Sequence, residues 1–343
     1  MNPLSAIFGS GVALRNALYD RGVLKIRKLA CPVVSVGNIS VGGSGKTPFV
    51  IALGGLLKER GIAFDVLSRG YGRDSAETAA VDPLGSPAQF GDEPLLIARK
   101  LQAPVIVGPD RYQAGVLAEK KFEVKLHILD DGFQHRRLHR DFDIVLVPAT
   151  DLEDTLLPLG RLREPVSSLH RADAVVYDIE GEEPGLSSAA DSLERVERVM
   201  EFEEQSAAPL VPVRAETWRI KRRTYLHEAP DKPLAFCGIA RPQRFFAQLR
   251  DLGLQPAETV AFPDHHRYTE SDIHRLLQVK SSTGAGGFVT TEKDAVNLGA
   301  LAERLQPLKI AELRLILKNP EQAVSTMLNT LEQRCGCRFP APA

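Results

Sequence analysis

Apolar and polar residues follow two alternating patterns along the first half of the chain. Short runs that are almost continuously apolar, such as 142–147, are typical of strands in a sheet covered on both faces. Longer stretches with apolar residues every three or four positions predict amphipathic helices between these runs. The predicted strands are 32–37, 63–68, 104–108, 124–129 and 142–147, and the predicted helices are 47–60, 92–102 and 110–121. This alternation indicates an α/β fold with a mostly parallel sheet and helices on both faces.

The same alternation returns in the second half of the chain. A turn-rich connection at 157–165 leads to a predicted strand at 172–179, and an acidic, polar stretch at 180–206 indicates a surface excursion. The later predicted strands are 233–239, 256–261, 286–291 and 309–316, and the later predicted helices are 242–252, 270–280, 295–305 and 320–333. We therefore expect an N-terminal amphipathic helix over 1–28, a main α/β domain over 29–214 and a second, smaller α/β domain over 215–343.

Composition narrows the class of protein. The 343 residues are 43% hydrophobic and 25% charged, with a formal net charge of −1, which is typical of a soluble globular protein. Nothing in this balance favours a nucleic-acid partner, and we expect none. The cysteines, Cys31, Cys237, Cys335 and Cys337, suggest neither a disulfide framework nor a zinc spacing, although Cys335 and Cys337 leave a weak metal pair open. A reducing cytosol is the expected compartment.

The first 28 residues combine apolar and basic side chains. No segment approaches the ~18–20 continuous apolar residues that a membrane-spanning helix requires, and no basic region precedes the apolar one as in a signal peptide. Two interpretations remain: a helix that lies in a membrane interface, and a helix that packs its apolar face on the domain. The basic residues are Arg15, Arg21, Lys25, Arg27 and Lys28.

A glycine-rich turn between the first strand and the first long helix of the main domain ends in Lys46 and Thr47. Strand, glycine turn and helix in this order predict a phosphate-binding loop, in which backbone N–H groups, the lysine and the helix N-terminus hold phosphates and the threonine holds Mg²⁺. Ser40 stands where the strict pattern has glycine, and an ordinary glycine-rich turn is the alternative. The predicted nucleotide-binding residues are Ser40, Val41, Gly42, Gly43, Ser44, Gly45, Lys46 and Thr47.

Acidic and basic residues follow the strand at 124–129. Asp130 and Asp131 end this strand, and a carboxylate at that place in a phosphate-loop fold binds Mg²⁺, although acids there also cap turns. The basic residues His135, Arg136 and Arg137 come next and are candidates for an acidic substrate, with a solvated charge run as the alternative.

Five further residues carry candidate chemistry. Arg69 and Arg73 follow the strand at 63–68 and belong either to the ligand-binding rim or to a flexible turn. Asp92 begins a helix, as a cap or as a general base. His265 and His266, next to an aspartate and before a helix, favour a catalytic site over a metal site.

Taken together, these motifs resemble the tetraacyldisaccharide 4′-kinase family, the lipid A 4′-kinases of Gram-negative bacteria. The resemblance extends over nearly the whole chain. Its motifs include the segments 18–22, 36–48, 68–73, 91–94, 130–135, 158–165, 264–266 and 291–295. It implies a P-loop NTPase-like kinase domain, a second α/β domain that closes the active-site cleft, and ATP and Mg²⁺ as cofactors. It also implies phosphorylation of the 4′-hydroxyl of tetraacyldisaccharide 1-phosphate, which forms the lipid A precursor lipid IVA.

The resemblance also assigns roles to residues. It implies that Asp92 is the catalytic base, and we expect His265 to pair with it, with His266 as the alternative. It implies peripheral attachment to the cytoplasmic face of the inner membrane through residues 1–28, and no obligate protein partner is evident. The competing classes are a P-loop switch NTPase without a lipid acceptor and a cytosolic small-molecule kinase.

Overall fold

The computed structural model describes residues 3–178 and 215–340. Within them, twelve strands form one sheet in the order β10-β9-β11-β12-β8-β7-β6-β1-β5-β2-β4-β3. The pairs β3–β4 and β8–β12 are antiparallel and the other pairs are parallel. The predicted fold class, a mostly parallel sheet with helices and a second α/β unit, is confirmed. The predicted excursion at 180–206 lies outside the described residues.

The main sheet agrees closely with the predicted strands. Its strands are β1 (Val33–Asn38), β2 (Phe64–Ser68), β3 (Ala79–Ala80), β4 (Val105–Val107), β5 (Leu126–Asp130), β6 (Phe142–Leu146), β7 (Ala174–Asp178) and β8 (Glu216–Tyr225). Every residue of β1, β2, β5 and β6 is buried, as expected for strands covered on both faces.

Helices cover both faces of this sheet. The α-helices are α1 (Pro3–Asp20), α2 (Lys46–Glu59), α3 (Pro87–Phe90), α4 (Asp92–Leu101) and α5 (Arg111–Lys121), and the 3₁₀ turns are η1 (Ala149–Asp151) and η2 (Val166–Arg171). Apolar side chains of α2 and α4 fill the core on one face. Those of α5 pack on the other face.

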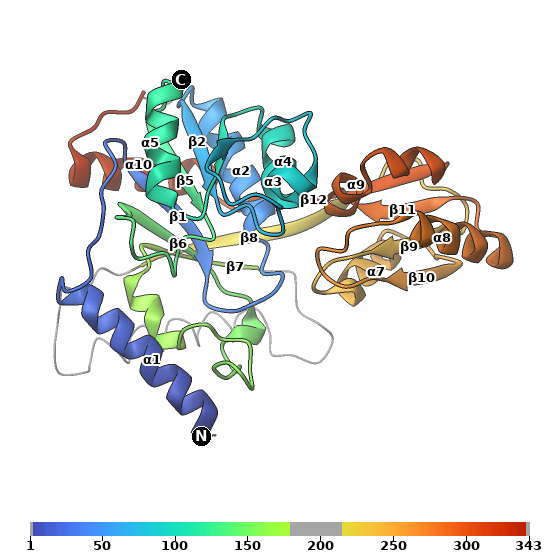
Figure 1. The fold of residues 1–343 in the computed structure, drawn as a ribbon, viewed down its shortest axis with the longest axis horizontal. Helices are drawn as coiled ribbons and strands as arrows, with labels where there is room; N and C mark the ends of the chain where they lie inside the picture. The colour runs from blue at the N-terminus through green and yellow to red at the C-terminus, as the bar shows by residue number, and fades with distance from the viewer. Residues whose placement is uncertain (1–2, 179–214, 341–343) are drawn as a thin grey trace.

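The second half of the chain builds a smaller unit, seen at the right of Figure 1. Its elements are β9 (Leu234–Cys237), α7 (Pro242–Asp251), β10 (Glu258–Ala261), α8 (Glu270–Thr283), β11 (Phe288–Thr291), α9 (Glu292–Leu298) and η3 (Gly299–Arg304). They enclose apolar cores of their own. The sequence-predicted strands and helices of this half correspond to these elements.

Two long strands connect the parts. The first residues of β12 (Leu308–Leu317) pair with β11, and its last residues pair with β8, which in turn pairs with β7. The chain then forms α10 (Pro320–Cys335), whose side chains Val324, Met327 and Leu331 join the main core beside α2. The small unit is therefore shorter than the predicted domain 215–343, because β8, half of β12 and α10 pack with the main sheet. The domain boundaries themselves stay predictions.

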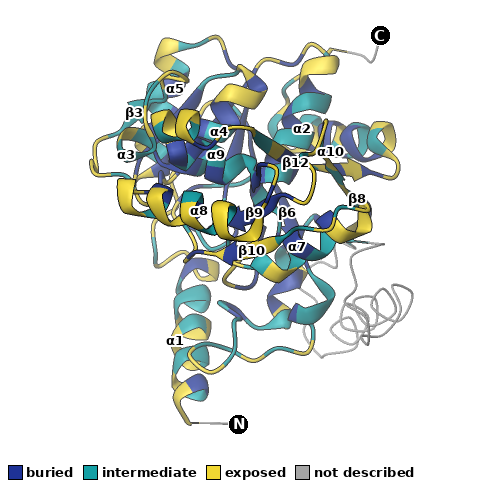
Figure 2. Cartoon of the chain, turned by 90° about the vertical axis from the view of Figure 1, so that its right-hand side faces the viewer, coloured by how far each residue is buried: buried dark blue, intermediate teal, exposed yellow. Residues whose placement is uncertain are grey.

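The N-terminal helix α1 extends away from the body of the molecule (Figures 1 and 2). The Ser5 hydroxyl donates to the Leu156 carbonyl at 2.9 Å, and Asn16 donates to the buried Glu164 carboxylate at 3.0 Å. Leu4 and Ile7 nevertheless remain 58% and 69% exposed. Among the described residues, no helix is both long and apolar enough to cross a bilayer.

Candidate active site

A cavity of about 540 Å³ lies between the main sheet and the small unit. Residues 41–48, which follow β1, line it from the main sheet, and Asp264, His265 and Lys293 line it from the small unit. The last residues of β2 and β5, Ser68 and Asp130, line the same wall, which is where open parallel sheets bind ligands.

The predicted phosphate-binding loop has the backbone that its glycines permit. Gly45, directly before α2, has a φ of 92°, and a Cβ there would lie 3.0 Å from the guanidinium of Arg222. Lys46 then begins α2, and its ammonium donates to Oδ1 of Asn38 at 3.1 Å. Ser44 is buried and its hydroxyl has no hydrogen-bond partner.

Ser40 has a different position from the rest of the loop. The cavity is lined from Val41 onward, so Ser40 lies behind this wall. Its hydroxyl donates to the buried Asp151, and its carbonyl accepts from Asn38 and Arg163. These bonds fix the path of the loop, and they explain why a serine rather than a glycine occupies this position.

The two carboxylates at the carboxyl end of β5, Asp130 and Asp131, have opposite surroundings. Asp131 lies 3.3 Å from the ammonium of Lys46 and 3.0 Å from the guanidinium of Arg163. Burial raises the pKa of Asp131, but these two cations outweigh it and hold the pKa well below its usual range. Asp131 is therefore already paired within the protein.

Asp130 has one carboxylate oxygen without a hydrogen-bond donor. Oδ2 accepts from the Ser68 hydroxyl at 3.0 Å, whereas the buried Oδ1 accepts no hydrogen bond. Burial, with the charges of Glu93 and Asp131, raises the pKa of Asp130 to about 7. A buried carboxylate oxygen of this kind suits a hard cation, and the Thr47 side chain lines the same cavity. The residues therefore fit a Mg²⁺ site.

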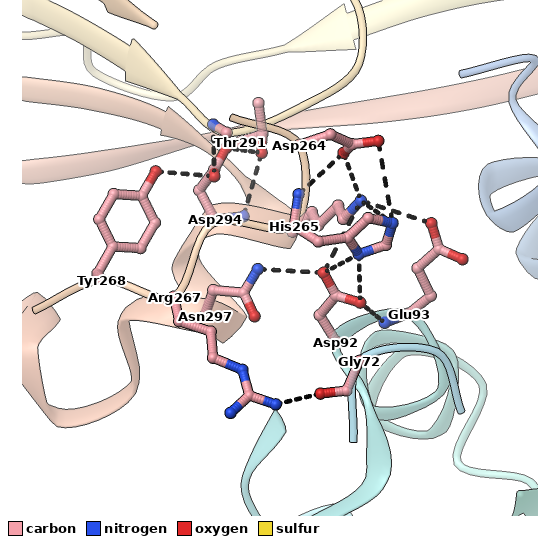
Figure 3. A network of polar contacts seen from close by, with 12 residues as sticks. Gly72, Asp92, Glu93, Asp264, His265, Arg267, Tyr268, Thr291, Asp294 and Asn297 are labelled. Atoms are coloured by element: carbon pink, nitrogen blue, oxygen red, sulfur yellow. Dashed lines mark hydrogen bonds and ion pairs between the residues drawn. The ribbon is translucent and has the colours of Figure 1, made fainter. Parts of the chain in front are cut away.

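Asp92 and His265 meet across the cavity (Figure 3). Gly91 precedes Asp92 with a φ of 88°, and a Cβ on it would approach the carbonyl oxygen of Tyr71 to 2.9 Å. Nδ1 of His265 lies 3.1 Å from Oδ1 and 2.9 Å from Oδ2 of Asp92, and Asn297 donates to Oδ2 at 3.1 Å. Burial would raise the pKa of Asp92, but the His265 hydrogen bond and the Lys293 charge lower it below the ordinary value.

The other ring nitrogen of His265 faces Lys293. The Lys293 ammonium lies 3.2 Å from Nε2, and because an ammonium only donates, the neutral ring carries its proton on Nδ1, toward Asp92. Burial lowers the pKa of His265, but the bond to Asp92 raises it above the ordinary value overall. Tyr71 packs against the ring at a centroid distance of 5.0 Å.

His266, the alternative partner of Asp92, points elsewhere. Its ring stacks on Phe262 at 4.7 Å, and its Nε2 lies 3.1 Å from Asp272 at the start of α8. The geometry thus favours His265 as the partner of Asp92.

The predicted substrate residues do not form one site. Arg69 lines the cavity, whereas Arg73 lies outside its lining. Arg136 is buried against α1, where it contacts Asp20 and the ring of Tyr19. None of His135, Arg136 and Arg137 lines the cavity.

His135 also differs from the expected basic residue. Burial and the nearby Arg111 and Arg140 guanidiniums lower the pKa of His135 to about 4. The ring is therefore neutral at physiological pH and cannot supply positive charge to an acidic substrate. Arg137 is exposed.

The sequence assigns no individual role to several polar residues at or near the cavity. Arg163, Arg222 and Lys293 line the cavity, and Asn297 donates to Asp92. Only Lys293 has a sequence signal, because it belongs to a charged segment directly after a strand. The other three reach the site through pairings between distant parts of the chain.

Comparison with known proteins identifies the family of this chain. The family model for LpxK, described as tetraacyldisaccharide-1-P 4′-kinase, matches residues 1–332. The chain belongs to the tetraacyldisaccharide 4′-kinase family. This match confirms the resemblance seen in the sequence. The chain is therefore a kinase.

Individual members of the tetraacyldisaccharide 4′-kinase family are similar over almost their full length. The enzyme of Koribacter versatilis is 49% identical over 346 residues, which cover 98% of this chain and 100% of the relative. The enzyme of Geobacter metallireducens is 38% identical over 328 residues, which cover 93% of this chain and 94% of the relative. The crystal structure of the "apo" form of LpxK from Aquifex aeolicus in complex with ATP superposes with a TM-score of 0.72 at 33% identity, covering 96% of this chain and 98% of that chain.

Proposed function

We propose that this chain transfers the γ-phosphoryl group of ATP to the 4′-hydroxyl of tetraacyldisaccharide 1-phosphate and so forms lipid IVA. The observation that carries the proposal is the shared cavity: the phosphate loop lines one side and the Asp92–His265 pair crosses to the other. A phosphoryl donor and an acceptor hydroxyl can therefore meet there. Family membership supports the choice of substrate.

Binding of the nucleotide is assigned to the loop from Val41 to Thr47. Its backbone N–H groups, the N-terminus of α2 and the Lys46 ammonium would hold the phosphates. The Thr47 hydroxyl and Asp130 would hold Mg²⁺, with Asp130 preferred over Asp131 because Asp131 is already paired with Lys46 and Arg163. When bound, Mg²⁺ neutralises charge on the β- and γ-phosphates.

Proton removal from the acceptor is assigned to Asp92. As the acceptor oxygen bonds to the γ-phosphorus, the bond from that phosphorus to the ADP oxygen breaks, and the hydroxyl proton passes to the Asp92 carboxylate. His265 orients this carboxylate through its Nδ1–H, and the Lys293 charge keeps it ionised.

Contact with the acidic part of the lipid is assigned to Arg69, which is exposed within the cavity wall. A guanidinium there can bind a phosphate of the acceptor in two-point geometry.

Peripheral membrane attachment through α1 completes the proposal. Leu4, Ile7 and Leu14 are exposed on this helix, and Arg21 and Lys25 are exposed just beyond it. Apolar side chains beside cations suit the interface of an anionic membrane such as the cytoplasmic face of the inner membrane. A lipid acceptor would then reach the cavity from that surface.

The decisive experiment measures transfer of radiolabelled γ-phosphate from ATP to purified tetraacyldisaccharide 1-phosphate in detergent, with Lys46→Ala as the control. Label on the lipid that is lost in the control is the expected result. Hydrolysis of ATP without labelled lipid would contradict the proposal and favour a switch NTPase.

Attachment is tested separately by flotation with vesicles that contain anionic phospholipid. The double variant Leu4→Ser/Ile7→Ser should float less than the unmodified chain. Leu84→Ser, at a residue that is 93% exposed on the main domain, is the matched control and should float normally. Equal flotation of all three proteins would exclude α1 as the membrane contact.

A further inference from the structure

A second cluster of ligand-type side chains lies at the edge of the main sheet opposite the cavity. Cys31 precedes β1, and His127 is the second residue of β5, so both lie where these parallel strands begin rather than where they end. Glu119, in the last turns of α5, reaches the same place. No residue of this cluster lines the cavity.

The ligand atoms of these three residues converge. The Cys31 sulfur, a Glu119 carboxylate oxygen and a His127 ring nitrogen all lie within 4.8 Å of one another. Nε2 of His127 is 3.3 Å from Oε1 of Glu119, and the Cys31 backbone N–H donates to the same oxygen at 2.8 Å. With metal–ligand bonds of about 2.0–2.3 Å in a tetrahedron, neighbouring ligand atoms lie about 3.3–3.8 Å apart. The Cys31 thiol now donates to the Val124 carbonyl at 3.3 Å, and rotation of this side chain away from that carbonyl would bring the sulfur to the required spacing.

The opposite nitrogen of His127 is held by a buried carboxylate. Nδ1 lies 3.0 Å from Oδ1 and 2.9 Å from Oδ2 of Asp65, and the side chains of both residues are fully buried. This arrangement fixes the ring and directs Nε2 toward Cys31 and Glu119. Metal-binding histidines have the same kind of outer carboxylate, which orients the ring and strengthens the ligand.

We propose that Cys31 Sγ, Glu119 Oε and His127 Nε2 form a binding site for a divalent cation of the Zn²⁺ class, with the fourth position open to water. Thiolate and imidazole ligands select such a cation over Mg²⁺, which separates this site from the oxygen ligands of the cavity. Binding displaces the thiol proton of Cys31, because the sulfur binds the cation as a thiolate. The Glu119 side chain is 20% exposed and gives the cation a route from solvent.

The cysteines at the end of the chain do not form this site. The Cys335 thiol donates to Oδ1 of Asp141 at 3.2 Å, and the Cys337 sulfur lies 3.7 Å from the Leu331 carbonyl. Within 3–178 and 215–340, Cys31, Glu119 and His127 form the one group of three metal-ligand side chains that converges.

The test uses the full-length protein, stripped of metal by a chelator and kept in excess Mg²⁺ so that oxygen-only sites are filled. Zn²⁺ affinity is measured against a chromogenic competitor, and Co²⁺ is used as a spectroscopic probe. We expect one Zn²⁺ per chain and a thiolate-to-cobalt charge-transfer band. Cys31→Ser should abolish the band and weaken Zn²⁺ binding at least about tenfold, whereas Cys335→Ser, the same change at a neighbouring half-buried thiol, should alter neither.

A second variant separates ligand loss from misfolding. Glu119→Gln keeps the size of the side chain at a partly exposed position, and circular dichroism checks that it folds. It should weaken Zn²⁺ binding while retaining the thiolate band. Absence of the band in the unmodified chain, or equal Zn²⁺ affinity in the Cys31 and Cys335 variants, would overturn the proposal and leave the cluster as a buried ion-pair network. These readouts do not depend on phosphoryl transfer, so they stand apart from the proposed function.

Discussion

Oδ2 of Asp92 lies 2.9 Å from Nδ1 of His265, although 173 residues separate the two in the chain. Asp92 begins α4 on the main sheet, and His265 belongs to the loop between β10 and α8 in the small unit. Nearby, Arg267 of the same loop donates to the Gly72 carbonyl (Figure 3). Arg267 also pairs with Asp74. The pair therefore exists only while the two parts of the molecule are held together, which makes it sensitive to their relative position.

Replacing Asp92 by Asn tests the proposed base. The amide keeps the size of the side chain but cannot accept the hydroxyl proton, so kcat should fall about 10²- to 10⁴-fold. Binding of ATP should change little, because Asp92 is not part of the phosphate loop. Steady-state kinetics with the lipid acceptor and nucleotide-binding titrations measure the two effects. Asp251→Asn, an exposed position at the end of α7, is the matched control, and an unchanged rate in Asp92→Asn would remove Asp92 as the base.

The pH dependence of kcat/KM should report His265 rather than Asp92. Asp92 has a lowered pKa and stays ionised from weakly acidic pH upward, whereas the pKa of His265 is raised above 6.5. Below that raised pKa, the doubly protonated ring neutralises the carboxylate and places an N–H against Lys293. The rate should therefore rise with pH through a value above 6.5 and then level off.

Two variants check this assignment. His265→Asn can still donate a hydrogen bond to Asp92 but does not titrate, so the rise should disappear, while His227→Asn, at an exposed histidine, should keep it. If kcat/KM of the His265→Asn variant still rises with pH at the same midpoint, the rise belongs to another titrating group. The two shifts imply that the Asp92–His265 pair stabilises the folded chain fully between about pH 4, the ordinary range of an aspartate, and pH 6.5. The stabilisation decreases as pH increases through the raised pKa of His265, and it decreases again as pH falls through the lowered pKa of Asp92.

Lys293 is expected to stabilise the carboxylates that surround it and to lower the pKa of His265. Its ammonium lies 3.8 Å from Asp92, 3.6 Å from Glu93 and 3.0 Å from Asp264. Lys293→Met leaves these carboxylates uncompensated, so the free energy of unfolding should fall by roughly 1–3 kcal/mol. Because the Lys293 charge opposes protonation of His265, its loss should also move the rise in kcat/KM to higher pH.

Thermal unfolding and the pH profile measure the two effects of Lys293→Met. Lys309→Met, which removes an exposed ion pair with Glu228, is the control and should change neither. A lower melting temperature without a shifted pH profile would show that Lys293 has only a structural role.

The sequence predicted the local elements well because their signals are local. The buried strand β1 and the helix α2 begin within one residue of the predicted starts at 32 and 47, since β-branched runs and the glycine before Lys46 mark these boundaries. The two-residue strand β3 and the one-turn helix α3 were not predicted, because such short elements have no periodicity.

The sequence did not predict contacts between segments that lie far apart in the chain. Periodicity predicted α10 as a helix but could not show that it packs beside α2 rather than in the small unit. Arg163 is hydrogen-bonded to Asp131 and to Asn38, and 125 residues separate it from Asn38 in the chain. Nothing in the sequence around Arg163 indicates either partner. The Asp92–His265 pair was expected only because a family resemblance suggested it.

Arg136 shows how the structure changes the meaning of a motif. The sequence grouped it with Arg137 as a candidate for substrate binding, but it is 8% exposed and is bonded to Asp20 and to the Asn16 carbonyl at the end of α1. Arg136→Gln should therefore loosen α1, reducing the free energy of unfolding by about 1–3 kcal/mol and exposing the α1 amides to hydrogen exchange. Arg137→Gln, at the exposed neighbour, should leave both unchanged.

Vesicle flotation and lipid kinetics distinguish the two roles of Arg136. If it anchors α1, the variant should float less well while its KM for the lipid in detergent stays normal, because detergent removes the need for membrane attachment. If it binds the acceptor directly, KM for the lipid should rise in detergent with hydrogen exchange of α1 unchanged. The first outcome follows from the buried contacts of Arg136 with α1, since a side chain that is bonded to α1 and does not line the cavity is not placed to bind a ligand there.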